Sequence, residues 1–315
     1  MGGRYGYPHR VRLSSLLSLV GLCGCNAAFG IGDLTFEEAT GDGGTSATGG
    51  AGGSESTGGT GGEGGTGGLG GAGGTDPTGL SDDGLLARYF FDDARRGMAP
   101  TTALDASPND VHLSIVFDNG ELLWDTLNDN AGLRWPNPGA DGSAQVIDVS
   151  DTPLGEGLAD SPTATVEVVA RIDDVVGTSS RLVDIGHAGL TQLSLGSDIL
   201  GSFEVRLADT TAGTFSSTDA IGTRQVYHLV IDLNDVDGKP VALYADGAPL
   251  PTLSRNALMT MGIPIDSLDA FVVGNRLDGS RSIEGFIGYV ALYDVPFDEA
   301  RIAAHAARLL ASDDP

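Results

Sequence analysis

Five oxygen-bearing side chains fall within one short stretch of the sequence: Asp92, Asp93, Asp105, Asn109 and Asp110. Carboxylate and amide oxygens are the ligands that Ca²⁺ prefers, with about six to eight oxygens around the ion. We expect these residues on two neighbouring loops. Asp and Asn are also common in turns without any metal, because their side chains bond to nearby backbone groups. Two alternatives therefore stay open, a Ca²⁺ site built from these residues or a pair of ordinary turns.

Paired carboxylates for hydrolysis of a glycosidic bond are missing. Such chemistry needs two acidic groups that face one bond, and positions i and i+2 of a strand share a face. No glutamate from Glu121 to Glu284 has an aspartate two residues later. Glu167 and Glu204 each stand alone in an alternating segment, and we expect both to face solvent. Because Gly-x-Ser-x-Gly and His-Glu-x-x-His motifs are also absent from the sequence, we expect no catalysis.

The remaining side chains with chemical potential are scattered. We expect His228, which lies within an alternating segment, to be a structural residue rather than a base. Four large aromatic residues could stack on sugar rings, but such side chains more often fill the core of a sandwich. We therefore expect core positions for Tyr89, Trp124, Trp135 and Tyr293.

Residues 226–250 give the clearest indication of fold. Val226–Leu233 alternates, with Tyr227, Leu229 and Ile231 on one side of the chain. This period of two predicts a strand with one face in a core. A second strand is predicted at Val241–Ala245, and Asp246-Gly247 is the residue pair that a tight type I′ hairpin requires.

Similar segments recur through the C-terminal three quarters of the chain. Their spacing, with Gly, Asp, Asn and Pro between them, predicts an antiparallel all-β sandwich over residues 81–315. One short C-terminal helix is predicted from the N-cap candidate Asp298 to Leu310. The other predicted strands are Leu85–Phe91, Val111–Phe117, Gly132–Trp135, Val146–Val149, Ala164–Ile172, Arg181–Ile185, Gln192–Leu195, Phe203–Leu207, Ala270–Val273 and Gly285–Tyr293.

The N-terminal residues 1–24 have the features of an export signal. Three arginines precede a short apolar run, Leu13–Leu22, which is too short to cross a bilayer. The following Leu22-Cys-Gly-Cys25 resembles the lipobox of bacterial lipoproteins. The resemblance implies cleavage before Cys25, lipid on its sulfur, and attachment to the outer membrane at the cell surface. The alternative is an ordinary signal peptide that is cut near Ala27-Ala28.

Residues 25–80 are predicted to form a disordered tether. Gly41 to Gly74 is rich in Gly and Thr, with Thr-Gly-Gly recurring. Such a segment buries too little apolar surface to offset the loss of chain entropy on folding.

Several short motifs in the folded region, in order, resemble laminin-G-like domains of the concanavalin A-like lectin/glucanase superfamily. They are Phe90-Phe-Asp-Asp93, Asp105-Ala-Ser-Pro-Asn-Asp110, Gly132–Trp135, Ala164–Arg171, Tyr227-His228, Leu243–Gly247, Val273-Gly-Asn275 and Ile283–Tyr293. The resemblance implies a jelly-roll sandwich that binds carbohydrate or protein, often with Ca²⁺ at its loops. Gly288 is a departure, since many relatives carry an acidic residue there.

The overall charge narrows the choice of partners. A formal net charge of -26, with a single lysine, makes nucleic acid a poor partner. We expect a non-catalytic, lipid-anchored surface protein that binds a glycan or another protein. A divergent polysaccharide hydrolase or lyase and a purely structural envelope or adhesion protein are the alternatives.

Overall fold

The computed structural model describes residues 79–312, except 93–100, 118–121, 128–129, 138–141, 175–179, 188, 198–201, 217–221 and 236–237. The predicted signal peptide, the lipidation site Cys25, nearly all of the predicted tether and Asp93 lie outside the described residues. All described residues belong to one compact unit, Thr66–Pro315.

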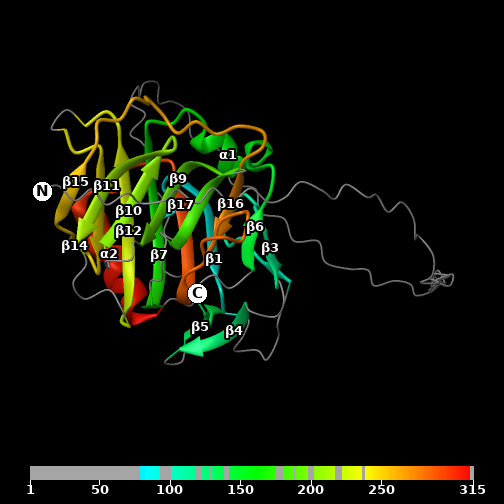
Figure 1. Ribbon diagram of the computed structural model, residues 1–315. Helices are drawn as coiled ribbons and strands as arrows, with labels where there is room; N and C mark the ends of the chain where they lie inside the picture. The colour runs from blue at the N-terminus through cyan, green and yellow to red at the C-terminus, as the bar shows by residue number, and fades with distance from the viewer. Residues whose placement is uncertain are drawn as a thin grey trace, which may run out of the picture. The chain divides into compact units, whose positions relative to one another are not determined.

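Two antiparallel sheets make up the described part of the chain (Figure 1). The predicted all-β sandwich with a short C-terminal helix is therefore confirmed. One sheet has the strand order β14 (Ala248–Pro249), β13 (Val241–Ala245), β12 (Arg224–Asp232), β7 (Thr163–Asp174), β17 (Glu284–Tyr293), β5 (Asn130–Trp135) and β4 (Leu123–Leu127), and β1 (Leu85–Phe90) also pairs with β17. The other has the order β15 (Thr252–Arg255), β11 (Thr210–Ser216), β10 (Ser202–Leu207), β9 (Leu190–Ser197), β8 (Ser180–His187), β16 (Ala270–Val273), β6 (Ser143–Val146), β3 (Leu113–Val116) and β2 (Thr102–Ala103).

The hairpin at 246–247 forms as predicted. Asp246 and Gly247 both have positive φ, 50° and 83°, and they join β13 to β14. One face of β12 was predicted to lie in a core, but both of its faces are buried. Tyr227, Leu229 and Ile231 pack between the sheets, while Val226 and Val230 are buried in a second apolar cluster on the opposite face.

Helix α2 (Glu299–Ala311) covers that second face. Asp298 is its N-cap, as predicted, and the carboxylate accepts a hydrogen bond from Arg301 N. Ile302, Ala306 and Leu309 are buried against the outer face of the sheet that contains β12, and Figure 1 shows α2 in red beside β12. Full burial of an Ile or Leu side chain contributes about 1.5–3 kcal/mol. Strands β7, β12 and β17 are consequently buried on both faces where α2 packs on them.

Gly288 has a structural role in β17. The register of β17 against β7 shifts between Ile287 and Tyr289, so Gly288 is the extra residue of a bulge. The strand pairs with β5 before the bulge and with β1 after it. Gly288 O also accepts a hydrogen bond from Phe91 N.

Some elements differ from the prediction. The strand predicted at Val146–Val149 ends at Val146, because Asp148 takes a positive φ of 53° and a 3₁₀ turn, Val149–Asp151, follows. Helix α1 (Pro153–Leu158) and strands β4, β11 and β15 were not predicted. In β11 a register shift breaks the alternation that would have revealed the strand. Neither described helix is long and apolar enough to span a membrane.

Candidate functional site

The nine-stranded sheet carries a row of polar side chains on its outer face. Asp184 of β8 pairs with Ser194 of β9, which pairs with Arg206 of β10. Their neighbours along the strands, such as Ile185, Leu193 and Leu207, are part of the core between the sheets. Because side chains alternate along a strand, Asp184, Ser194 and Arg206 point away from that core. The outer face of this sheet is therefore polar.

Two of the charged side chains on this face are buried, so they stabilise the sheet and are not available to contact a ligand. Arg181 and Asp184 have side chains only 2% and 1% exposed, with Arg181 Nε 3.5 Å from Asp184 Oδ1. Burial raises the pKa of Asp184 to about 6, although Arg181 and a hydrogen bond from Thr191 act in the opposite direction. Burial likewise lowers the pKa of Arg181. Glu204 and Arg206, which are more exposed, lie beside this pair and 3.7 Å from one another.

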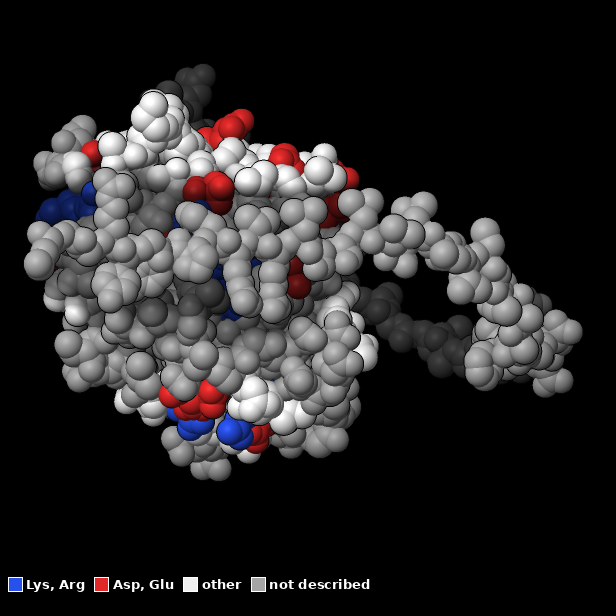
Figure 2. All heavy atoms as spheres, viewed as in Figure 1, with Lys and Arg blue, Asp and Glu red and all other residues white. Residues whose placement is uncertain are grey.

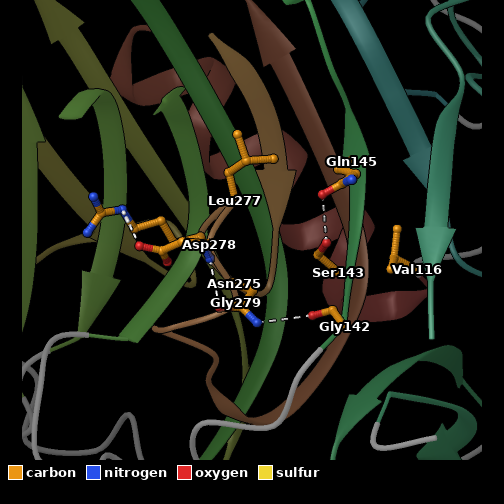
Figure 3. Close-up of a pocket in the computed structure, with 9 residues that line it drawn as sticks. Val116, Gly142, Ser143, Gln145, Asn275, Leu277, Asp278 and Gly279 are labelled. Carbon is orange, nitrogen blue, oxygen red and sulfur yellow. Dashed lines mark hydrogen bonds and ion pairs between the residues drawn. The ribbon is translucent and has the colours of Figure 1, made fainter. Parts of the chain in front are cut away.

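A pocket of about 200 Å³ lies at one end of this face (Figure 3). Its walls come from the end of β3, from β6 and from the loop that follows β16. Gln145 lies in the same cross-strand row as Asp184, through Val272, and both Val272 and Asp184 are buried. The polar lining groups include Ser143, Gln145, Asn275, Arg276 and Asp278.

The loop after β16 is held in place by Asn275 and Trp135. Asn275 is fully buried; its Oδ1 accepts hydrogen bonds from Arg276 N and Arg281 N, and its Nδ2 donates to Gly142 O. Trp135 Nε1 donates to the same carbonyl at 3.0 Å. Gly274 has a φ of 75°, and an added Cβ there would lie 2.1 Å from the Trp135 ring. The pocket wall is therefore fixed from behind by buried groups.

The rim of the pocket carries opposite charges. Arg276 Nε lies 3.9 Å from Asp278 Oδ2. Burial alone would raise the pKa of Asp278, but hydrogen bonds from the Ser280 hydroxyl and backbone and the nearby arginines lower it. A carboxylate, a guanidinium and an amide around a small hollow supply both acceptors and donors for a hydroxylated ligand.

The predicted Ca²⁺ residues mostly have other partners. Asp105 accepts hydrogen bonds from Arg88 N, Ser107 N, the Ser107 hydroxyl and Val111 N. Asn109 Nδ2 donates to Leu85 O and Leu86 O. Asp110 has a positive φ of 56° and Asp92 follows β1. These contacts fit a loop that is organised by its own side chains, and a Ca²⁺ site remains a prediction.

Two expectations about acidic side chains on strands have different outcomes. Glu167 was expected to face solvent, which is wrong: its side chain is 0% exposed, because α2 covers that face of β7. Glu204 does point outward, but its side chain is only 16% exposed, and it accepts a hydrogen bond from Thr211 Oγ1. His228 is structural, as expected, and bonds to Glu167. Tyr89, Trp135 and Tyr293 are buried, and Trp124 packs against the core while partly buried.

The pocket residues were not predicted as a site. The sequence Asn275-Arg-Leu-Asp-Gly279, a polar turn between two buried strands, was the available indication. On the face shown in Figure 2, described acidic side chains lie along the upper edge and, next to basic side chains, at the lower edge.

No family model matches the chain, and no curated protein matches it. Solved structures of other proteins do match the chain. A mutant of Trypanosoma rangeli sialidase displaying trans-sialidase activity is 16% identical with a TM-score of 0.51, covering 72% of this chain and 33% of that one. The T. rangeli sialidase in complex with sialic acid is 15% identical with a TM-score of 0.50, covering 71% and 32%.

The binding domain of botulinum neurotoxin DC in complex with SialylT is 11% identical, with a TM-score of 0.51, covering 72% of this chain and 52% of that one. The chain thus spans about a third to a half of the length of these structures. At such identities the likeness concerns the fold alone. It shows a β-sandwich fold that these structures share with this chain.

Proposed function

We propose that this protein is a non-catalytic surface lipoprotein whose laminin-G-like sandwich binds carbohydrate. Lipid on Cys25 anchors it to the outer membrane, and residues 25–80 hold the sandwich away from the lipid surface. The ligand lies in the pocket beside Arg276 and Asp278.

The observation that carries the proposal is the pocket itself, in which Gln145, Arg276 and Asp278 line one hollow. Buried groups fix this lining from behind, because Asn275 and Trp135 both donate hydrogen bonds to Gly142 O. Sugar hydroxyls need several donors and acceptors in fixed positions, which planar Gln, Arg and Asp groups provide. Two neighbours of the same fold, the T. rangeli sialidase and the botulinum neurotoxin DC binding domain, are solved in complex with sialic acid and SialylT. This supports a glycan as the ligand class.

The geometry also supports the absence of catalysis. A carboxyl group whose pKa is about 6 is what a general acid requires, and Asp184 has such a pKa. Its side chain is only 1% exposed, however, and accepts a hydrogen bond from Thr191 Oγ1. We therefore propose that Asp184 stabilises the sheet through its contacts with Arg181 and Thr191 and does not transfer a proton.

A glycan array probed with the purified protein tests the proposal. We expect binding to one class of glycan, weakened at least about tenfold by Arg276→Ala, because a hydrogen bond to a charged group contributes about 1.5–3 kcal/mol. The matched control is Arg134→Ala, since Arg134 lies on the other sheet and pairs with Asp125. It should bind like the wild type.

The same array separates the alternatives. Release of reducing ends from the bound polysaccharide would contradict a non-catalytic role and favour a hydrolase. Absence of binding to any glycan would contradict the proposal and favour a structural envelope or adhesion protein.

A further inference from the structure

A second group of polar side chains lies at the opposite end of β16 from the pocket. Asp269 directly precedes β16, and His187 ends β8; Ala270 pairs with Gly186 in the ladder between these strands. This register brings His187 Nδ1 to 2.6 Å from Asp269 Oδ1 and 3.7 Å from Asp266 Oδ1. Among the described residues, this is the one group of three such side chains whose ligand atoms all lie within 4.8 Å of one another.

Two of the three side chains are largely or fully buried and held in place by hydrogen bonds, and Asp266 opens the group to solvent. Asp269 is fully buried, and its Oδ2 accepts a hydrogen bond from Asp266 N. Asp266 Oδ1 accepts one from Leu268 N, while the side chain remains 49% exposed. His187 is 15% exposed. An ion from solution could therefore reach the three groups without unfolding of the sheet.

We propose that His187, Asp266 and Asp269 bind a divalent transition-metal ion, with Zn²⁺ favoured. One imidazole nitrogen and two carboxylate oxygens are ligands that Zn²⁺ accepts, and three protein ligands leave a position for water. Ca²⁺ is disfavoured, because it takes about six to eight oxygens and no nitrogen.

The distances require only a small adjustment. Metal–ligand bonds of about 2.0–2.2 Å place two ligand atoms of a tetrahedral site roughly 3.3–3.6 Å apart. The separation of 3.7 Å between His187 and Asp266 is already close to this range. The separation of 2.6 Å between His187 and Asp269 has to widen by less than about 1 Å, as the ion replaces the proton between the two atoms.

A bound ion would join two segments of the chain that are far apart in sequence. The ion would connect the β8–β9 turn to the segment that leads into β16. Since a ligand that binds only the folded state raises its stability, Zn²⁺ should raise the melting temperature. This inference does not depend on glycan binding, because the pocket lies beyond the other end of β16.

The test is a Zn²⁺ titration of the purified full-length protein against a chromophoric chelator, after removal of metal with EDTA and blocking of the cysteine thiols with iodoacetamide. We expect one Zn²⁺ per chain and a higher melting temperature with Zn²⁺. His187→Gln and Asp266→Asn should each weaken binding at least about tenfold, since even the loss of an outer-shell partner costs about 10–100-fold. Asp266→Asn preserves the acceptor for Leu268 N, so this variant should fold.

Two variants serve as matched controls. Asp209→Asn removes an acidic group that is 48% exposed, close to the 49% of Asp266, and His112→Gln removes a surface histidine outside the group. Both should bind Zn²⁺ like the wild type. The inference would be overturned by a wild type that does not bind Zn²⁺, by unchanged affinity in His187→Gln and Asp266→Asn, or by Ca²⁺ displacing Zn²⁺ at equal concentration.

Discussion

The carboxylate of Glu167, in the middle of β7, accepts a hydrogen bond of 2.8 Å from His305 Nδ1 on helix α2. Ser81 N donates to the other ring nitrogen, His305 Nε2, at 3.1 Å. Since one nitrogen donates and the other accepts, this geometry assigns the neutral imidazole to His305. Glu167 thus connects the central sheet, the C-terminal helix and the start of the folded region.

Three more donors complete the environment of Glu167. His228 Nε2 lies 3.0 Å from Oε1, and the hydroxyls of Tyr289 and Tyr293 donate to Oε2 at 3.2 and 2.8 Å. The side chain of Glu167 is fully buried. A buried charge without such partners would be strongly unfavourable, so the hydrogen bonds explain why an acidic residue is tolerated there.

Replacement of Glu167 by glutamine should destabilise the protein. The variant Glu167→Gln keeps the shape but turns one acceptor oxygen into an amide donor that faces other donors. Loss of hydrogen bonds to a buried charged group is worth about 1.5–3 kcal/mol each, and we expect a decrease of about 2–5 kcal/mol in the free energy of unfolding, measured with urea. Glu156→Gln, on the exposed surface of α1, is the control and should cost less than about 1 kcal/mol. Equal effects of the two variants would contradict the role of Glu167.

The stability difference between wild type and Glu167→Gln should depend on pH. Burial raises the pKa of Glu167, but the hydrogen bonds from His228 and His305 outweigh it and hold the pKa well below its ordinary range. A carboxyl group with a depressed folded-state pKa stabilises above its unfolded pKa of about 4.3, and this contribution is lost as the pH falls toward the folded value. The difference in unfolding free energy between the two proteins should therefore be constant from about pH 6 to 5 and shrink below about 4.5. A difference that stays constant or grows at low pH would show that this carboxyl is not ionised in the fold.

The contrast between Glu167 and Glu204 shows how far the sequence pattern can be taken. Both stand alone in alternating segments, so both look like solvent-facing residues. Glu204 does point away from the core, and no described helix packs on its face of the sheet, but its side chain is only 16% exposed. Glu167 does not face solvent, because α2, about 130 residues later, covers the outer face of β7. An alternating pattern identifies the two faces of a strand but not a later element that covers one of them.

Local turn chemistry was predictable and long-range assembly was not. Asp246-Gly247 and the N-cap Asp298 depend on a few adjacent residues and were predicted correctly. The pocket wall depends on the hydrogen bond between Asn275 and Gly142, which are 133 residues apart. Similarly, His187 and Asp269 are 82 residues apart. Such contacts depend on which strands are neighbours in the sheet. The alternation of polar and apolar residues in one sequence does not reveal that order.

Lipid attachment at Cys25 can be tested by substitution. In a bacterial host grown with an alkyne analogue of palmitate, we expect the wild type to carry the label and to fractionate with membranes. Cys25→Ala should lose both properties, because the acylated sulfur is absent. Cys23→Ala is the matched control; it keeps a small residue at its position in the lipobox and should be labelled like the wild type. Label retained in Cys25→Ala, or an unlabelled wild type, would contradict the proposed anchor.

The pocket wall should be sensitive to a single methyl group at Gly274. Gly274 and Gly238 have the same φ of 75°, but an added Cβ at Gly238 meets nothing within 4 Å, whereas at Gly274 it lies 2.1 Å from the Trp135 ring. The backbone penalty for a left-handed residue, about 1–2 kcal/mol, is common to both substitutions. Gly274→Ala should therefore cost at least about 1–3 kcal/mol more than Gly238→Ala, the usual penalty of overpacking. Urea unfolding of the two variants measures this difference, and the tryptophan fluorescence of Gly274→Ala should change because Trp135 has to move. Equal destabilisation by the two substitutions would mean that Trp135 does not hold the loop that bears Arg276 and Asp278.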